Sequence, residues 1–106
     1  MATTTYKVLG QSNPSATTLT TLYTVPSATS AVVSTITIAN QSATAATYRV
    51  SIRVAGAADT AKQYVAYDIS LPGNATDTLT LGVTLAATDV ISVYASSATV
   101  SFNAFG

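Results

Sequence analysis

Apolar and polar side chains alternate along most of this chain with a period of two. Between residues 47 and 54, for example, the even-numbered positions carry Tyr, Val, Ile and Val, whereas the odd-numbered positions carry Thr, Arg, Ser and Arg. This period is typical of a strand with one buried face and one solvated face. The pattern predicts eight strands: Thr5–Leu9, Thr17–Val25, Val32–Ile38, Thr47–Val54, Tyr64–Ile69, Thr76–Leu85, Asp89–Ala95 and Thr99–Phe105.

Turn-forming residues separate these strands. The strongest turn signal is Leu71–Asn74, where Pro presets φ and Gly or Asn accepts a positive φ. The segment nearest to a helix, Gly56–Lys62, is Ala-rich but barely two turns long. Eight short strands with turns between them predict an all-β chain that folds as one antiparallel β-sandwich over residues 1–106, either jelly-roll-like or immunoglobulin-like.

The composition adds an unusually low charge to this picture. Only 8% of the 106 residues are charged, with four Lys or Arg against four Asp, whereas a typical soluble domain is about 25% charged. Thr, Ala and Ser make up nearly half of the chain. Because a soluble domain normally depends on charge to stay dispersed, this surface indicates a protein that packs against other proteins or one that tolerates high density.

The residue types that are missing exclude several functions. The chain has no Cys and no His, so it lacks a thiolate nucleophile, a Ser-His-Asp triad and the common zinc ligands. Four basic residues are too few for a typical grip on nucleic-acid phosphates, and no apolar run is long enough to span a membrane. A Ser–Lys dyad using Lys7 or Lys62 is formally possible, but no motif surrounds either lysine. We expect no enzyme activity, no cofactor and no metal site.

The four carboxylates are expected to have structural roles. Three are expected at or near turns, where Asp bonds to local backbone: Asp59, Asp77 and Asp89. Asp68 instead lies within a predicted strand whose other face carries Val65, Tyr67 and Ile69. We expect it to form a cross-strand ion pair with Arg49 or Arg53. Those two arginines share the outer face of one strand, so an alternative is that they meet an acidic partner surface.

Aromatic side chains are the other candidates for contact with a partner. Tyr64 and Tyr67 are expected on opposite strand faces, which argues against a single sugar-stacking platform and favours core or interface roles. Phe102 and Phe105 place two aromatic rings near the C-terminus, which suggests that this segment is tied into a sheet. The complete set of interface candidates is Arg49, Arg53, Tyr64, Tyr67, Asp68, Phe102 and Phe105.

Several segments together resemble a known family. They are Tyr6–Gln11, Leu22–Pro26, Tyr64–Asp68, Leu85–Val90 and Ser101–Gly106. The chain resembles small virion structural proteins of tailed bacteriophages, which are frequent among phages of cyanobacteria. This resemblance implies β-sandwich modules, often homotrimers, that decorate a capsid or belong to the tail, fibre or baseplate, and it brings no catalytic residues.

The resemblance leads to a functional expectation. We expect a non-enzymatic capsid decoration (cement) protein that binds the major capsid protein or other virion proteins, with no nucleic acid or membrane partner. We also expect it to form a homo-oligomer, with a trimer favoured. A tail, fibre or baseplate module that contacts host glycans is the alternative. In either case the protein is expected in the virion, assembled in the host cytoplasm. The scarcity of Lys and Pro also predicts unguarded strand edges, which partners would cover.

Overall fold

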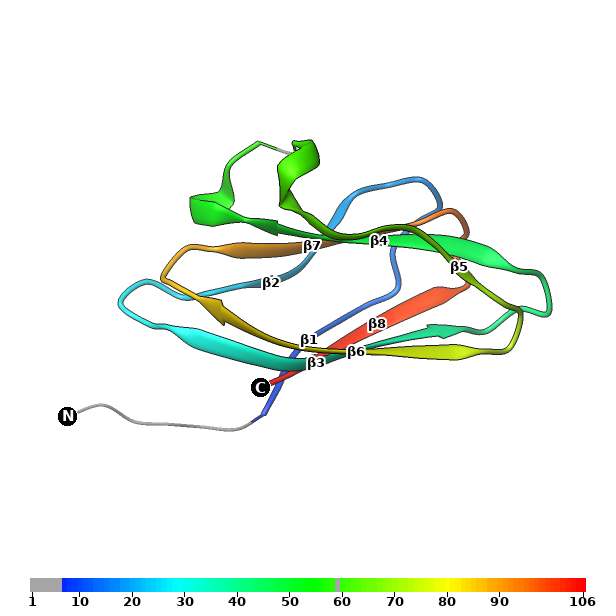
Figure 1. Cartoon of the computed structure of the whole chain (residues 1–106), viewed down its shortest axis with the longest axis horizontal. Coiled ribbons are helices and arrows are strands. Elements are labelled where there is room, and N and C mark those ends of the chain that lie inside the picture. The colour runs from blue at the N-terminus through cyan, green and yellow to red at the C-terminus, as the bar shows by residue number, and fades with distance from the viewer. Residues whose placement is uncertain (1–6, 59) are drawn as a thin grey trace.

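The computed structural model describes residues 7–58 and 60–106, without the side chains of residues 61 and 81. Within these residues eight strands form two four-stranded antiparallel sheets that pack face to face (Figure 1). Sheet A has the order β1 (Val8–Ser12), β8 (Val100–Phe105), β3 (Ala31–Asn40), β6 (Thr76–Leu85). Sheet B has the order β2 (Thr20–Thr24), β7 (Val90–Ala95), β4 (Ala46–Arg53), β5 (Tyr64–Leu71).

This strand order confirms the predicted β-sandwich and decides which kind it is. Orders 1-8-3-6 and 2-7-4-5 are those of the eight-stranded jelly roll, in which every connection passes from one sheet to the other except the connection between β4 and β5. All eight predicted strands are present, with ends displaced by a few residues. Of the first predicted strand, residues 5 and 6 lie outside the described residues.

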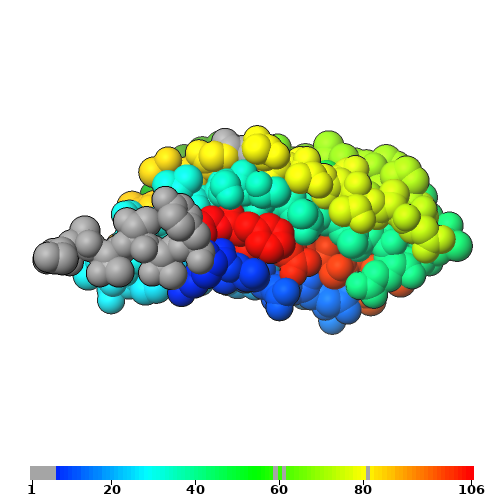
Figure 2. Space-filling view, turned by 90° about the horizontal axis from the view of Figure 1, so that it is seen from below, coloured from blue at the N-terminus to red at the C-terminus, as the bar shows by residue number. Residues whose placement is uncertain are grey.

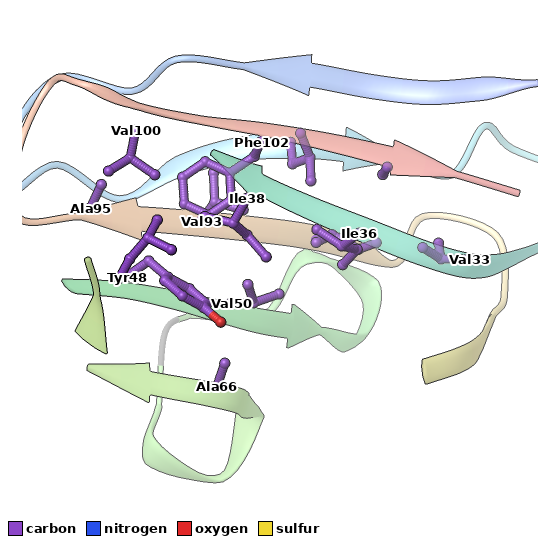
Figure 3. Close-up of a cluster of buried hydrophobic side chains, with 14 of the residues drawn as sticks. Val33, Ile36, Ile38, Tyr48, Val50, Ala66, Val93, Ala95, Val100 and Phe102 are labelled. Atoms are coloured by element: carbon purple, nitrogen blue, oxygen red, sulfur yellow. The ribbon is translucent and has the colours of Figure 1, made fainter. Parts of the chain in front are cut away.

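The inward positions of both sheets form one hydrophobic core. Phe102 of β8 and Ile36 and Ile38 of β3 face Tyr48 and Val50 of β4 across the sandwich (Figure 3). The rings of Tyr48 and Phe102 meet edge to face, with their centroids 6.2 Å apart. Full burial of side chains of this size stabilises a fold by about 1.5–3 kcal/mol each. The core therefore explains why a chain with few charges holds a defined fold.

The two open sides of the sandwich are closed differently. On one side β1 and β2 approach so closely that a Cβ at Gly10 would clash with the backbone carbonyl of Leu22. On the other side the hydroxyl of Tyr48 crosses from sheet B and donates to Oδ2 of Asp77 on β6 over 3.0 Å. Asp77 was expected to bond to local backbone at a turn, and this is wrong. It lies within β6 and faces inward, opposite the buried Ile38.

Every edge strand carries a bulge. The register shifts within all four pairs that join an edge strand to its inner neighbour, β1–β8, β2–β7, β3–β6 and β4–β5, and in each the extra residue is on the edge strand. The inner pairs keep a continuous register, over residues 35–40 of β3 against β8 and over residues 48–53 of β4 against β7. Bulges twist an edge away from pairing with another chain. The edge strands therefore carry bulges as a feature that opposes strand addition, and coverage of the edges by partners stays a prediction.

The connection between β4 and β5 covers one end of sheet B on its outer side (Figure 1). It contains two short 3₁₀ turns, η1 (Val54–Gly56) and η2 (Ala61–Gln63), in place of a helix. Asp89 fixes this connection, since its carboxylate accepts backbone N–H groups of Ala55 and Ala86, each over 2.9 Å. These bonds lower the pKa of Asp89 and confirm its expected role at a turn. Asp59 lies outside the described residues.

Candidate functional site

Arg49 stands at the centre of an aromatic cluster on the outer face of sheet B. The guanidinium carbon lies 4.2 Å from the ring centroid of Tyr67 on β5 and 4.3 Å from that of Tyr94 on β7. The register places Tyr94 directly opposite Arg49 on the neighbouring strand. A guanidinium within about 6 Å of an aromatic face is attracted by the ring's quadrupole. Arg49 is therefore held between two tyrosines from the strands on either side of it.

Asp68 of β5 completes the contacts of this arginine. Nε of Arg49 donates to Oδ1 over 2.6 Å, and Nη2 donates to Oδ2 over 3.2 Å, which is a bidentate pair. The hydrogen bond from Arg49 lowers the pKa of Asp68, and the same bond raises the pKa of Arg49. Both groups remain charged at neutral pH. The expected cross-strand ion pair is confirmed, with Arg49 as the partner.

Two bulges in β5 decide which side chains join the cluster. Val50 pairs with Ala66 and Tyr48 with Ile69, so Tyr67 and Asp68 together oppose Arg49. Asp68 has a φ of 49°, which lets both side chains point outward at this bulge. The expectation that Tyr67 and Asp68 lie on opposite faces is therefore wrong.

The second bulge corrects the prediction for Tyr64. Ser51 pairs with Tyr64 while its neighbour Val50 pairs with Ala66, so one extra residue lies between the two pairings. The rings of Tyr64 and Tyr67 consequently meet edge to face, with centroids 5.0 Å apart, although a regular strand would put them on opposite faces. The Tyr–Arg cluster, as we name it, consists of Arg49, Tyr64, Tyr67, Asp68 and Tyr94.

Arg53 shares the outer face with Arg49 but has a different role. Its guanidinium donates to the carbonyl oxygens of Gly56 and Ala57 over 3.1 and 2.7 Å, and to Oγ of Ser92 over 3.3 Å. These bonds hold the β4–β5 connection against sheet B. Arg53 therefore stabilises the fold and lies outside the Tyr–Arg cluster, while Asp68 pairs with Arg49.

The two phenylalanines do not join the cluster. Phe102 is fully buried in the core, so it is not available to a partner on the surface of this chain, and its assignment to an interface is wrong. Phe105 is half-buried on the outer face of sheet A, where it pairs with Val8 and Thr35. Strand alternation explains the difference, because residues 102 and 105 fall on opposite faces of β8.

Tyr94 is the one cluster residue that lies outside the set of interface candidates chosen from the sequence. The alternation of Ile91, Val93 and Ala95 already places Tyr94 on the outer face of its strand. Its contact with Arg49 depends on the pairing of β7 with β4, two strands about 40 residues apart in the chain. The outward phase could have been found from the sequence, but the partner could not.

The cluster has the chemistry of a protein-contact surface. Tyr67 is 52% exposed, and the neighbouring β5 residues Val65 and Ile69 are 48% and 41% exposed. Tyr and Arg are enriched among the residues that dominate protein interfaces, especially where they are already rigid. Arg49 already occupies the faces of two rings, Tyr67 and Tyr94, which leaves less free aromatic face for stacking on a sugar.

Among the described residues no group of three or more His, Cys, Asp or Glu is placed to hold a metal ion. The described part of the chain contains no helix with the length and hydrophobicity to cross a membrane. The chain matches no protein-family model, no curated protein and no solved structure.

Proposed function

We propose that this chain is a non-enzymatic structural protein of a bacteriophage virion, and that it decorates the capsid shell. The Tyr–Arg cluster on the outer face of sheet B is the observation that carries the proposal. It offers a rigid patch in which the one cation and the one anion neutralise each other. Such a patch can be covered by a protein partner without leaving an unpaired charge, which is the costly case in an interface.

The low charge of the chain supports a role at high local density. A protein present in many copies on a shell meets neighbours of its own kind, and few charges mean little repulsion between them. Many weak contacts on one particle then add up, because a particle that presents repeated sites binds a multivalent layer tightly. The major capsid protein is the partner proposed for the cluster. The resemblance of the sequence to virion structural proteins supports the same role.

The test is to measure copy number and binding on the particle. Mass spectrometry of purified virions, referenced to the major capsid protein, should find a number of copies comparable with the number of capsomers. A count typical of a tail or fibre would replace this proposal with the alternative module that contacts host glycans. Absence from the particle would refute both.

Variants test the cluster itself. Tyr67→Ala and Arg49→Ala should reduce rebinding of the purified protein to heads that lack it, because each removes a central part of the patch. Val54→Ala is the matched control, since Val54 is an apolar side chain 67% exposed on η1 and outside the cluster. Equal binding of all three variants and the unaltered chain would refute the assignment of this face. Heads without the protein should also lose integrity at a lower temperature.

A further inference from the structure

The outer face of sheet A is free of charge. The four strands β1, β8, β3 and β6 contain a single ionisable side chain, Asp77, and it faces the interior. The face is instead lined mainly by neutral polar groups and short side chains, and Figure 2 shows the four strands side by side on it. Lys7 lies directly before β1, at the rim of this face.

Cross-strand pairing arranges these neutral groups in rows. Thr37 on β3 pairs with Thr78 on β6 and with Asn103 on β8, and Asn103 pairs with Gln11 on β1. Nε2 of Gln11 donates to Oδ1 of Asn103 over 2.8 Å, so part of the row is already hydrogen-bonded. Hydroxyl and amide groups cost far less to remove from water than charges do. A partner can therefore cover this row without burying an ion.

One end of the same face is apolar. Val8 is 49% exposed and pairs with the half-buried Phe105, and Val32 is 54% exposed. The backbone links these residues, because Lys7 and Gly106 exchange two hydrogen bonds of 2.7 and 3.1 Å and Gly106 lies against the carbonyl of Val32. This apolar end can supply the hydrophobic burial that the row of hydroxyl and amide groups lacks.

We propose that a second copy of this chain packs on this face, sheet A against sheet A, in a two-fold dimer. An isologous contact brings like surfaces together, so each patch must complement itself. A face without charges meets that condition, since no like charges are placed opposite one another. A contact of sheet A with the outer face of sheet B would instead be heterologous, and copies joined in this way would form a ring or an open filament rather than a closed dimer.

The fold also limits how copies can meet. All four edge strands are bulged, which opposes growth of either sheet by addition of a strand from another copy. Face-to-face packing uses no edge. Four strands spaced by about 4.8 Å, with a mean length of about eight residues, give a face of roughly 500 Å² in projection. The combined area of two such faces lies near the lower limit for specific protein interfaces. The fraction of chains in the dimer should therefore depend on the protein concentration.

The inference does not rest on a role in the virion, and it is tested on the isolated protein. Light scattering during size exclusion should give a mass approaching twice 10.7 kDa as the concentration rises. Thr37→Lys and Thr37→Asp should each give a monomer, because Thr37 is on an inner strand of the face and a two-fold contact brings two added like charges close together. Mixing these two variants should restore a dimer, since opposite charges then meet.

Thr47→Lys is the matched control, because Thr47 is a half-buried threonine on β4, an inner strand of sheet B. It should dimerise like the unaltered chain. A monomer at all concentrations, or a trimer, would overturn the proposal. So would dimers of Thr37→Lys alone, or a mixture of the two Thr37 variants that stays monomeric, since restoration requires that both variants are folded and meet through the same face.

Discussion

The hydrogen bond between Tyr48 and Asp77 joins the two sheets at the β5–β6 side, and Tyr48→Phe removes it. The hydroxyl donates to Oδ2 of Asp77 over 3.0 Å, while the ring stays packed against Phe102. Because Phe retains the ring, the variant loses the bond without opening a cavity. A well-buried hydrogen bond to a charged acceptor contributes about 1.5–3 kcal/mol net, and solvation of the acceptor reduces this. Asp77 is half-buried, so water can replace the lost donor. We expect the free energy of unfolding to fall by about 1 kcal/mol at neutral pH.

Alkaline pH provides a second and independent expectation for the same residue. Burial, then the hydrogen bond to Asp77 and its negative charge, raises the pKa of Tyr48 from 10.0 to about 12. The folded protein therefore keeps a proton that the unfolded chain loses near pH 10. The corresponding stability is fully present below pH 10 and is lost as the pH rises towards about 12. A shift of this size bounds the loss at roughly 2 to 3 kcal/mol, and the partial solvation of Asp77 reduces it.

Urea unfolding followed by circular dichroism measures both effects, since the chain has no Trp for fluorescence. The stability advantage of the unaltered protein over Tyr48→Phe should shrink between pH 10 and about 12, and it should reverse where the alkaline loss exceeds about 1 kcal/mol. Asp77→Asn removes the charge but keeps an acceptor oxygen. Its loss of stability at alkaline pH should therefore be smaller than that of the unaltered protein and larger than that of Tyr48→Phe. Equal stability at neutral pH together with a constant difference at alkaline pH would refute the reasoning.

Two further predictions concern the core and the loop. Phe102→Ala should lower the free energy of unfolding by about 3–5 kcal/mol because it leaves a cavity in the core, whereas Phe105→Ala, at a half-buried surface position, should cost clearly less. Similar urea midpoints for the two would contradict the burial of Phe102. In Asp89→Asn the stability should fall less steeply than in the unaltered protein as the pH is lowered into the acid range. The lowered pKa of Asp89 means that its contribution is present above its ordinary pKa of 3.8 and is lost as the pH falls through the folded-state pKa. Melting temperatures measured over that range test this, and an unchanged acid slope would count against the bonds to Ala55 and Ala86.

The sequence alone determined the eight strands and the β-sandwich. Strand alternation depends on backbone geometry, which acts over neighbouring residues and leaves a period-two pattern that can be read directly. That pattern also separates Phe102 from Phe105, because they are three positions apart on one strand. The ion pair of Asp68 was predictable as well, since a chain with four cations offers few partners and Arg49 and Arg53 lie on one strand face.

The tertiary structure alone decided which side chains meet on the surface. Tyr64 joins Tyr67 because two bulges break the alternation of β5, and Tyr94 meets Arg49 because β7 pairs with β4 in one particular register. Bulges and registers arise from the packing of both sheets around a shared core, which involves residues far apart in the chain. A local period cannot encode them. The strands could therefore be read from the sequence, whereas the Tyr–Arg cluster and the charge-free face required their arrangement in space.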